Sequence, residues 1–208
     1  LLSERVHPVV EELDDVFGVD SDTFKQSLEI LERAYEESEH ADVHRQEWAD
    51  YLTYAQGESP DEQVQLYLRH TYLASFAKLL SYMVFTRGSM PGIDDAKEVL
   101  SGEITAPFPE NLFEEDLFAW VGRTDAGDDF VELLLDRLLQ FNLGRVDQDV
   151  FKRLYQDMVS YEVRHDLGEY YTPDWLAEYI VREKMDIEAD DSVLDPGCGS
   201  GTFLFDAL

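Results

Sequence analysis

The stretch Val193-Leu194-Asp195-Pro196-Gly197-Cys198-Gly199-Ser200-Gly201-Thr202-Phe203-Leu204 decides how this chain is interpreted. It begins with a short apolar run and continues into an acidic, glycine-dense loop. Residues 192–194 predict a buried strand, and residues 202–208 predict the opening of a helix. Glycines at alternate positions allow positive φ and a close approach of a ligand to the backbone. The stretch therefore predicts a ligand-binding turn between a strand and a helix.

Spacing narrows the kind of ligand that this loop suits. A dinucleotide-binding fingerprint that starts at Gly197 would need Gly or Ala where Thr202 stands. A phosphate-binding P-loop would need Lys followed by Ser or Thr after the last glycine, but Thr202 and Phe203 follow Gly201. An aspartate at the strand end would also repel a diphosphate at close range. The loop therefore favours a ligand with some positive character.

The loop resembles the S-adenosylmethionine loop of the amino-methylating DNA methyltransferases, whose usual form is Asp-Pro-x-Cys-Gly-Ser-Gly-x-Phe-Leu. The matching residues are Asp195, Pro196, Cys198, Gly199, Ser200, Gly201, Phe203 and Leu204. A cationic sulfonium with an amino-acid tail fits close backbone and a carboxylate better than a phosphate cradle does. The resemblance implies that the loop surrounds the methionine portion of the cofactor through Asp195, Pro196, Gly197, Gly199 and Gly201.

A second motif precedes the loop, in the segment Gly168-Glu169-Tyr170-Tyr171-Thr172-Pro173. By itself it predicts a helix start, with Thr172 as N-cap, Pro173 in the first turn and an amphipathic helix over 174–181. In the same methyltransferases a Gly-x-Tyr/Phe-Tyr-Thr-Pro segment lies shortly before the cofactor loop. The resemblance implies that the Thr172 hydroxyl and nearby amides bind the methionine carboxylate, while Tyr171 and Pro173 shape the pocket.

The resemblance is strong over about 165–208 and weaker upstream. Residues 151–167 look like the helix that precedes this motif in type I modification subunits and in fused type II restriction–modification enzymes, and residues 70–80 look like the helical domain of the fused class. It implies a parent enzyme that methylates adenine N6 in DNA, with DNA and a specificity or restriction subunit as partners.

The base-binding part of such an enzyme does not occur in these residues. No Asn/Asp-Pro-Pro-Tyr/Phe segment, which in the family holds the flipped base, is found before Leu208, nor is the acidic residue that binds the ribose after the next strand. We therefore assign no catalytic residue and expect that segment beyond Leu208. The start at Leu1 and the stop at Leu208 predict a piece of a longer protein, inactive alone and with a half-built cofactor pocket.

The chain is strongly acidic, with 46 Asp and Glu against 16 Lys and Arg and a formal net charge of -30. An aromatic content of 12% argues against a disordered acidic chain. A DNA mimic or a partner for basic proteins stays open. We favour a surface adapted to high salt, where self-repulsion is screened, and hence a halophilic source.

Cysteine and histidine usage points to no disulfide and no metal. Cys198 is the single cysteine, so an intrachain disulfide is excluded, and the family loop implies that it packs and does not act as a nucleophile. His40 and His44 could share a metal only with a third ligand, and a solvated helix face is the favoured interpretation. Arg164 and His165 are candidates for phosphate or cofactor contact, with an exposed hinge as the default. Without a leader or a membrane-length apolar run, we expect a cytoplasmic protein.

The hydrophobic periodicity is helical for most of the length, which predicts a mainly α fold. We expect an N-terminal helical domain over 1–165, followed over 166–208 by the beginning of a Rossmann-like methyltransferase domain. The helix starting near Ser59 is apolar nearly all round and is expected to be central, whereas 88–130 is expected to be an irregular region of short helices. Helices are predicted over 6–17, with Gly18 ending the first, over 21–35, with Ser21 as N-cap, and over 59–85, with Ser59 and Pro60 at its start. Further helices are predicted over 43–55, 130–141 and 150–163.

Two alternatives from other classes remain. The first is an S-adenosylmethionine enzyme that acts on protein or small molecules. The second is a non-catalytic interaction module, whose helical domain docks a subunit or mimics DNA. The first is separated from a DNA methyltransferase by the Asn/Asp-Pro-Pro-aromatic segment, and the second by binding measurements with candidate subunits.

Overall fold

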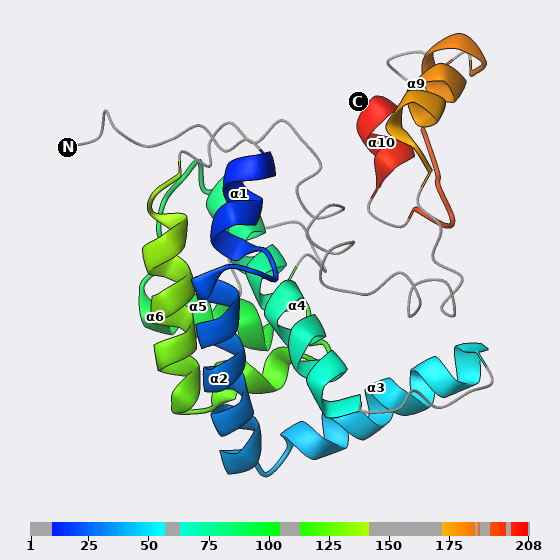
Figure 1. Cartoon of the computed structure of the whole chain (residues 1–208). Helices are drawn as coiled ribbons and strands as arrows, with labels where there is room; N and C mark the ends of the chain where they lie inside the picture. Colours follow the sequence, from blue (N-terminus) through cyan, green and yellow to red (C-terminus); the bar gives the residue numbers. More distant parts are fainter. Residues whose placement is uncertain are drawn as a thin grey trace. The chain divides into compact units, whose positions relative to one another are not determined.

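The computed structural model describes residues 10–56, 63–104, 113–141, 172–185, 187, 192–198 and 201–207. The chain divides into two compact units, Leu1–Val159 and Ser160–Leu208, called here the helical unit and the C-terminal unit. The regular elements of the described residues are all helices (Figure 1). The predicted mainly α class is therefore confirmed.

Helix α4, Gln63–Phe85, is the central helix of the helical unit. Helices α2, α3, α5 and α6 all contact it. Because its apolar residues are distributed all round, it has side chains to bury in every direction, and Tyr67, Tyr72, Phe76 and Leu79 are fully buried. The predicted central helix is confirmed from Gln63 onwards.

Helices α1, Val10–Phe17, and α2, Asp22–Glu37, form the first corner of this unit. Helix α1 ends at Gly18, as predicted. The Ser21 hydroxyl then accepts a hydrogen bond from the Phe24 amide at 3.0 Å, which confirms Ser21 as the N-cap of α2. The corner is tied to the centre because the Tyr72 hydroxyl donates to the Phe17 carbonyl at 2.8 Å.

Helix α3, Ala41–Gln56, begins just after α2. The Ser38 hydroxyl accepts a hydrogen bond from the Ala41 amide at 3.1 Å and so caps the new helix. Tyr35 donates to Asp42 at 2.7 Å, and Arg45 donates to both of them. These contacts fix the angle between the two helices at their junction.

Helices α5, Ile93–Ser101, and α6, Ala126–Leu138, complete the helical unit with the 3-10 helix η1, Ala119–Arg123. The short helices predicted for this irregular region are thus confirmed in α5 and η1. The chain turns at Gly102, which ends α5 with φ 79° and lies against the backbone of Glu114 and Glu115. A lysine holds this region to the centre: Lys78 of α4 donates to the Leu100 and Glu114 carbonyls at 3.0 and 3.2 Å and pairs with Asp116 at 3.0 Å.

The C-terminal unit contains α9, Asp174–Glu183, and α10, Thr202–Ala207, which pack against each other. Ala177 and Val181, one turn apart on α9, are buried. Both helices were predicted from the sequence and are confirmed in position.

The prediction of a buried strand at 192–194 is wrong. These residues have no regular secondary structure, and Val193 and Leu194 are 41% and 85% exposed. A strand is stabilised by hydrogen bonds to a neighbouring strand. The described part of the chain offers no such neighbour, so apolar character alone does not produce a strand here. The Rossmann-like beginning therefore stays a prediction.

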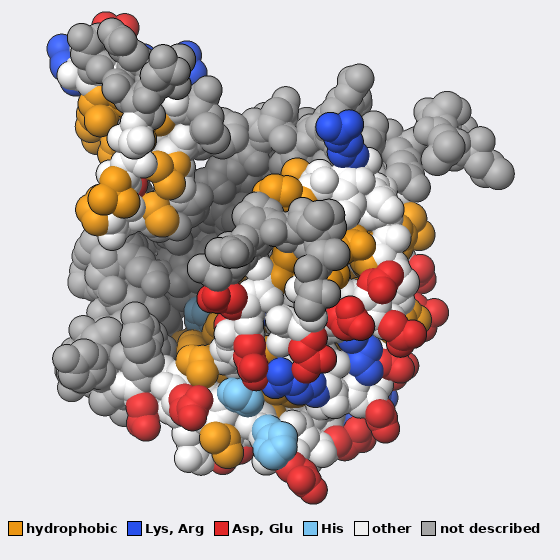
Figure 2. Space-filling view, turned by 180° about the vertical axis from the view of Figure 1, so that it is seen from behind, with side chains coloured by type: hydrophobic (Ala, Val, Ile, Leu, Met, Phe, Trp, Pro, Cys, Tyr) orange, Lys and Arg blue, Asp and Glu red, His pale blue; other side chains and the backbone are white. Residues whose placement is uncertain are grey.

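The surface of the helical unit is rich in carboxylates. Figure 2 shows Asp and Glu side chains over much of the visible face of this unit, with few Lys and Arg among them. Among the described helices, none is long and apolar enough to cross a membrane.

Several sequence predictions lie outside the described residues. They are the helix start at Ser59 and Pro60, the helix over 150–163, the Arg164 and His165 hinge and the domain boundary at 165/166. Tyr171 and Gly199 of the predicted cofactor site also lie there.

Candidate functional site

The acidic loop after Leu194 folds into a tight turn. The Asp195 Oδ1 atom accepts a hydrogen bond from the Gly197 amide at 3.0 Å, which is the turn that an aspartate two residues ahead of a backbone donor forms. Pro196 presets φ between these two residues. The carboxylate is therefore held beside the backbone of the turn, and Asp195 itself is half-buried.

The turn leads into α10 through Gly201, whose backbone conformation favours glycine. Gly201 has φ 87°, a left-handed value that side chains rarely adopt, and its amide donates to the Cys198 carbonyl at 2.7 Å. A Cβ atom built on Gly197 or Gly201 would meet nothing within 4 Å. The glycines therefore leave open backbone surface that the described residues do not fill. Cys198 is exposed, so the packing expected for it is wrong here.

The start of α9 differs by one residue from the sequence prediction. Pro173, and not Thr172, occupies the N-cap position, with φ −57° and ψ 138°, and its own side chain makes no capping hydrogen bond. The Pro173 carbonyl accepts from the Leu176 and Ala177 amides at 2.9 and 3.1 Å, so the first helical hydrogen bond already starts at the proline. An N-cap residue has an extended ψ, and proline adopts this conformation readily. Pro173 can therefore mark the start of α9 by its backbone conformation.

An apolar hollow of about 190 Å³ lies beneath the loop. Helix α9 contributes its second half, the loop contributes Asp195 and Pro196, and α10 contributes two side chains. The lining residues are Ile180, Val181, Met185, Ile187, Val193, Leu194, Asp195, Pro196, Phe203 and Ala207. Sequence reasoning missed this hollow, although the apolar positions of α9 and α10 were its signal.

The structure brings part of the predicted cofactor site together. Asp195 and Pro196 lie over the hollow, whereas Thr172 and Pro173 do not line it. Gly197 is exposed in the turn and Gly201 follows it at the start of α10. The cofactor roles of these residues, and of Tyr171 and Gly199 outside the described residues, remain predictions.

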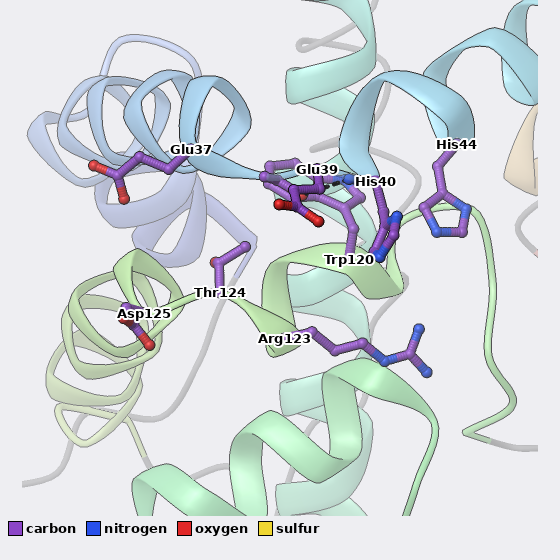
Figure 3. Close-up of a pocket in the computed structure, with 9 residues that line it drawn as sticks. Glu37, Glu39, His40, His44, Trp120, Arg123, Thr124 and Asp125 are labelled. Atoms are coloured by element: carbon purple, nitrogen blue, oxygen red, sulfur yellow. Dashed lines mark hydrogen bonds between the residues drawn. The ribbon is translucent and has the colours of Figure 1, made fainter.

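A second hollow, of about 330 Å³, lies in the helical unit where α2, α3 and η1 meet (Figure 3). His40 and His44 lie beside each other near Trp120, and Arg123 extends along the same opening. Arg123 is already engaged by Glu115 and Glu103, and its guanidinium holds the pKa of Glu115 below its usual range through a hydrogen bond. The arginine that lines this hollow is therefore already paired with carboxylates.

Metal binding finds no support in the described part of the chain. No group of three or more His, Cys, Asp or Glu side chains there could hold an ion. His40 and His44 thus have no third ligand among those residues.

The comparisons with known proteins concern the segment that holds the loop. Residues 146–208 match the sequence model of the N-6 DNA Methylase family. The chain also has a curated relative in Methanocaldococcus jannaschii, the Type I restriction enzyme MjaVII methylase subunit, with 39% identity over 70 residues. That match covers 33% of this chain and 12% of the relative. No solved structure matches the chain.

The family match includes both sequence motifs. The resemblance to N6-methylating DNA methyltransferases of restriction–modification systems is therefore confirmed for the C-terminal segment. The relative is far longer than the matched region, so the activity of a whole protein is a separate question.

Proposed function

We propose that this chain is part of a DNA methyltransferase that transfers a methyl group from S-adenosylmethionine to adenine N6 in a restriction–modification system. One observation carries the proposal. The segment that matches the N-6 DNA Methylase family contains the Tyr171-Thr172-Pro173 motif and the Asp195 to Gly201 loop, in the family's order. Identity to a type I methylase subunit supports the same conclusion.

The loop fits the proposed cofactor. Asp195 holds a carboxylate next to backbone amides, which suits the positive charge of a sulfonium or an ammonium group. Gly197 and Gly201 leave their backbone open to a ligand because no other described group would meet a Cβ there. When bound, S-adenosylmethionine would supply an activated methyl group.

In this proposal the chain's residues bind and orient the cofactor and take no part in proton transfer. Thr172 and the first amides of α9 would hold the methionine carboxylate, because a helix N-terminus favours an anion. The full proposed set is Tyr171, Thr172, Pro173, Asp195, Pro196, Gly197, Gly199 and Gly201.

The proposed partners are DNA and another subunit of the same enzyme. The chain has a net charge of -30, so it offers DNA little electrostatic attraction. We propose that other parts of the parent protein hold most of the DNA and that a specificity or restriction subunit binds alongside. A cytoplasmic location and a high-salt source complete the proposal.

The test uses the parent protein with S-adenosylmethionine and duplex DNA, and detects N6-methyladenine by mass spectrometry of the digested DNA. Asp195→Asn is expected to weaken cofactor binding about tenfold or more, as for a lost charged hydrogen bond of about 1.5–3 kcal/mol. Glu183→Gln, an exposed change on α9, is the control and should leave binding unchanged. A methyl group found on protein or on a small molecule, and never on DNA, would refute the proposal.

The 208 residues themselves should bind S-adenosylmethionine weakly or undetectably in calorimetry, because the acidic residue that binds the ribose in the family is not found among them. A micromolar affinity would show that these residues already contain a complete pocket.

A further inference from the structure

Helix α9 buries its smallest apolar side chain most completely. Ala177 is fully buried, and Val181, one turn later, is 6% exposed. The larger side chains of Trp175 and Tyr179 are 69% and 46% exposed. A helix that only contributed apolar surface to a core would bury its largest side chains, because the stabilisation grows with the area buried. The complete burial of an alanine therefore indicates that this side of α9 is approached closely by another element.

The element that approaches this side of α9 is α10. Figure 1 shows the two helices beside each other, and they are in contact. Val181 lines the hollow together with Phe203 and Ala207 of α10, so the side of α9 that carries Val181 faces α10. Ala177 lies one turn earlier on the same side. The distance between two packed helix axes, about 8–10 Å, depends on the side chains at the contact. The small side chain of Ala177 therefore permits a short distance between α9 and α10.

Each of these helices is continuous with one of the two sequence motifs. The Ala177 amide donates to the Pro173 carbonyl at 3.1 Å, so Ala177 belongs to the first turn of α9, next to Thr172 and Pro173. Helix α10 begins immediately after Gly201, whose amide donates to the Cys198 carbonyl at 2.7 Å. Hydrogen-bonded helical turns move as rigid elements. A displacement of either helix therefore carries its motif with it.

We propose that Ala177 is a positioning residue, whose small side chain sets the distance between the Thr172–Pro173 motif and the Asp195–Gly201 loop. This inference rests on the proposed function, in which both motifs hold the methionine portion of one cofactor molecule. A binding site keeps its groups within about 0.5 Å of the productive geometry. A larger side chain at residue 177 moves the two helix axes apart by on the order of 1 Å, which exceeds that tolerance.

A purely structural role for Ala177 predicts a different result. If Ala177 only filled the interior, a larger side chain would lower stability through overpacking. Every ligand that binds the folded protein would then lose affinity by the same factor. If Ala177 sets the distance between the motifs, only a ligand that reaches both motifs loses affinity. Ligands with and without the methionine portion therefore distinguish the two roles.

The experiment measures two Kd values of the parent protein by titration calorimetry, one for S-adenosylmethionine and one for 5′-methylthioadenosine, which lacks the amino-acid tail. Ala177→Leu should raise Kd for S-adenosylmethionine by more than about tenfold, and Ala177→Val by about threefold or more, because overpacking grows with side-chain size. Kd for 5′-methylthioadenosine should change by less than about twofold in both variants. Ala177→Ser should keep both Kd values within about twofold, because its hydroxyl is small and can bond the carbonyl one turn earlier.

Ala34 of α2 is the matched control. It is also a fully buried alanine of a helix, but it lies in the helical unit. Ala34→Leu should lower stability through overpacking, as Ala177→Leu does, and should leave Kd for S-adenosylmethionine within about twofold. Urea denaturation followed by circular dichroism shows which variants are folded under the conditions of the titration. If Ala177→Leu does not fold, the comparison of Ala177→Val with Ala177→Ser decides.

Steady-state methylation of duplex DNA provides a second measurement. In Ala177→Val, KM for S-adenosylmethionine should rise by about threefold or more, whereas KM for DNA should stay within about twofold. A loss of folded protein alone would lower the rate without separating the two KM values.

Three outcomes would overturn the inference. They are an unchanged Kd for S-adenosylmethionine in the larger variants of Ala177, equal losses of affinity for the two ligands, and an equal loss in Ala34→Leu. DNA methylation distinguishes the inference from the proposed function. Methylation with a cofactor affinity that is insensitive to residue 177 refutes the positioning role alone. Cofactor binding that depends on residue 177, in a protein that methylates no DNA, refutes the proposed function alone.

Discussion

The helical unit and the C-terminal unit differ in how completely they cover their apolar side chains. In the first, Phe76 and Tyr72 of α4 are fully buried beneath four other helices. In the second, α9 and α10 cover each other on one side only, and Trp175 and Leu194 remain exposed. A few short elements cannot enclose a core, because surface grows relative to volume as a unit shrinks. The segment that indicates the function is thus the one whose described residues are least enclosed.

Removing a phenylalanine ring from each unit tests this difference most strongly. Phe76→Ala should lower the free energy of unfolding of the helical unit by about 3–5 kcal/mol, because the ring is fully buried and leaves a cavity. Phe203→Ala, in the half-buried lining of the hollow, should cost the C-terminal unit much less. Urea denaturation followed by circular dichroism and by Trp175 fluorescence measures the two units. Equal losses would contradict the contrast between them.

Two left-handed glycines give the second test. Gly201→Ala should cost about 1–2 kcal/mol, since φ 87° is unfavourable for a side chain but the space around it is open. Gly102→Ala should cost about 1–3 kcal/mol more, because its Cβ would also overlap the backbone of Glu114 and Glu115. Gly88→Ala, with φ 81° and open space in the helical unit, is the matched control and should behave like Gly201→Ala. Thermal denaturation ranks the three.

Changes at the N-termini of α2 and α9 should have a smaller effect on stability. Ser21→Ala should destabilise the helical unit by about 1 kcal/mol, because the hydroxyl caps the Phe24 amide. Thr172→Ala should cost α9 less than Ser21→Ala costs α2, because the N-cap position of α9 belongs to Pro173 and not to Thr172. Hydrogen exchange of the first amides of α2 and α9 measures both. A matching loss of protection in α9 would mean that Thr172 caps it after all.

The smallest predicted effect is a pH dependence that belongs to the helical unit. Burial lowers the pKa of His70 below the ordinary value for a histidine, although the hydrogen bond from Nδ1 to the Leu66 carbonyl acts in the opposite direction. As the pH falls below 6.5, His70 is therefore protonated in the unfolded chain before it is protonated in the folded chain, and the free energy of unfolding decreases. Between pH 7.5 and 6 the change should stay under about 1 kcal/mol.

Substitution identifies the group responsible for that slope. His70→Gln should remove it, whereas His40→Gln, at an exposed position, should keep it. Urea midpoints at several pH values above the range where carboxylates titrate would show this. A slope that survives in His70→Gln would assign the effect to another group.

Local signals in the sequence predicted the helices well. Ser21 as N-cap, the end of α1 at Gly18 and the apolar run of α4 each depend on a few neighbouring residues, so they could be located without a structure. The acidic loop was likewise visible as Asp195 followed by glycines, and the positive φ of Gly201 agrees with that pattern.

Features that depend on distant partners were not predictable. The apolar run at 193–194 predicted a strand, but strand formation needs a neighbour that a local pattern does not specify. Lys78 is an ordinary position on a helix until Asp116 and two carbonyls are brought to it by the fold. The sequence could not decide between Thr172 and Pro173 as N-cap, because both residues can adopt the extended ψ that an N-cap residue has.

The contacts of Lys78 concentrate the attachment of two stretches of chain in one side chain. Its ammonium binds the Leu100 carbonyl at the end of α5 and the Glu114 carbonyl further along the chain. Both stretches are therefore anchored to α4 by one charged group, so a change that removes the ammonium releases both of them together.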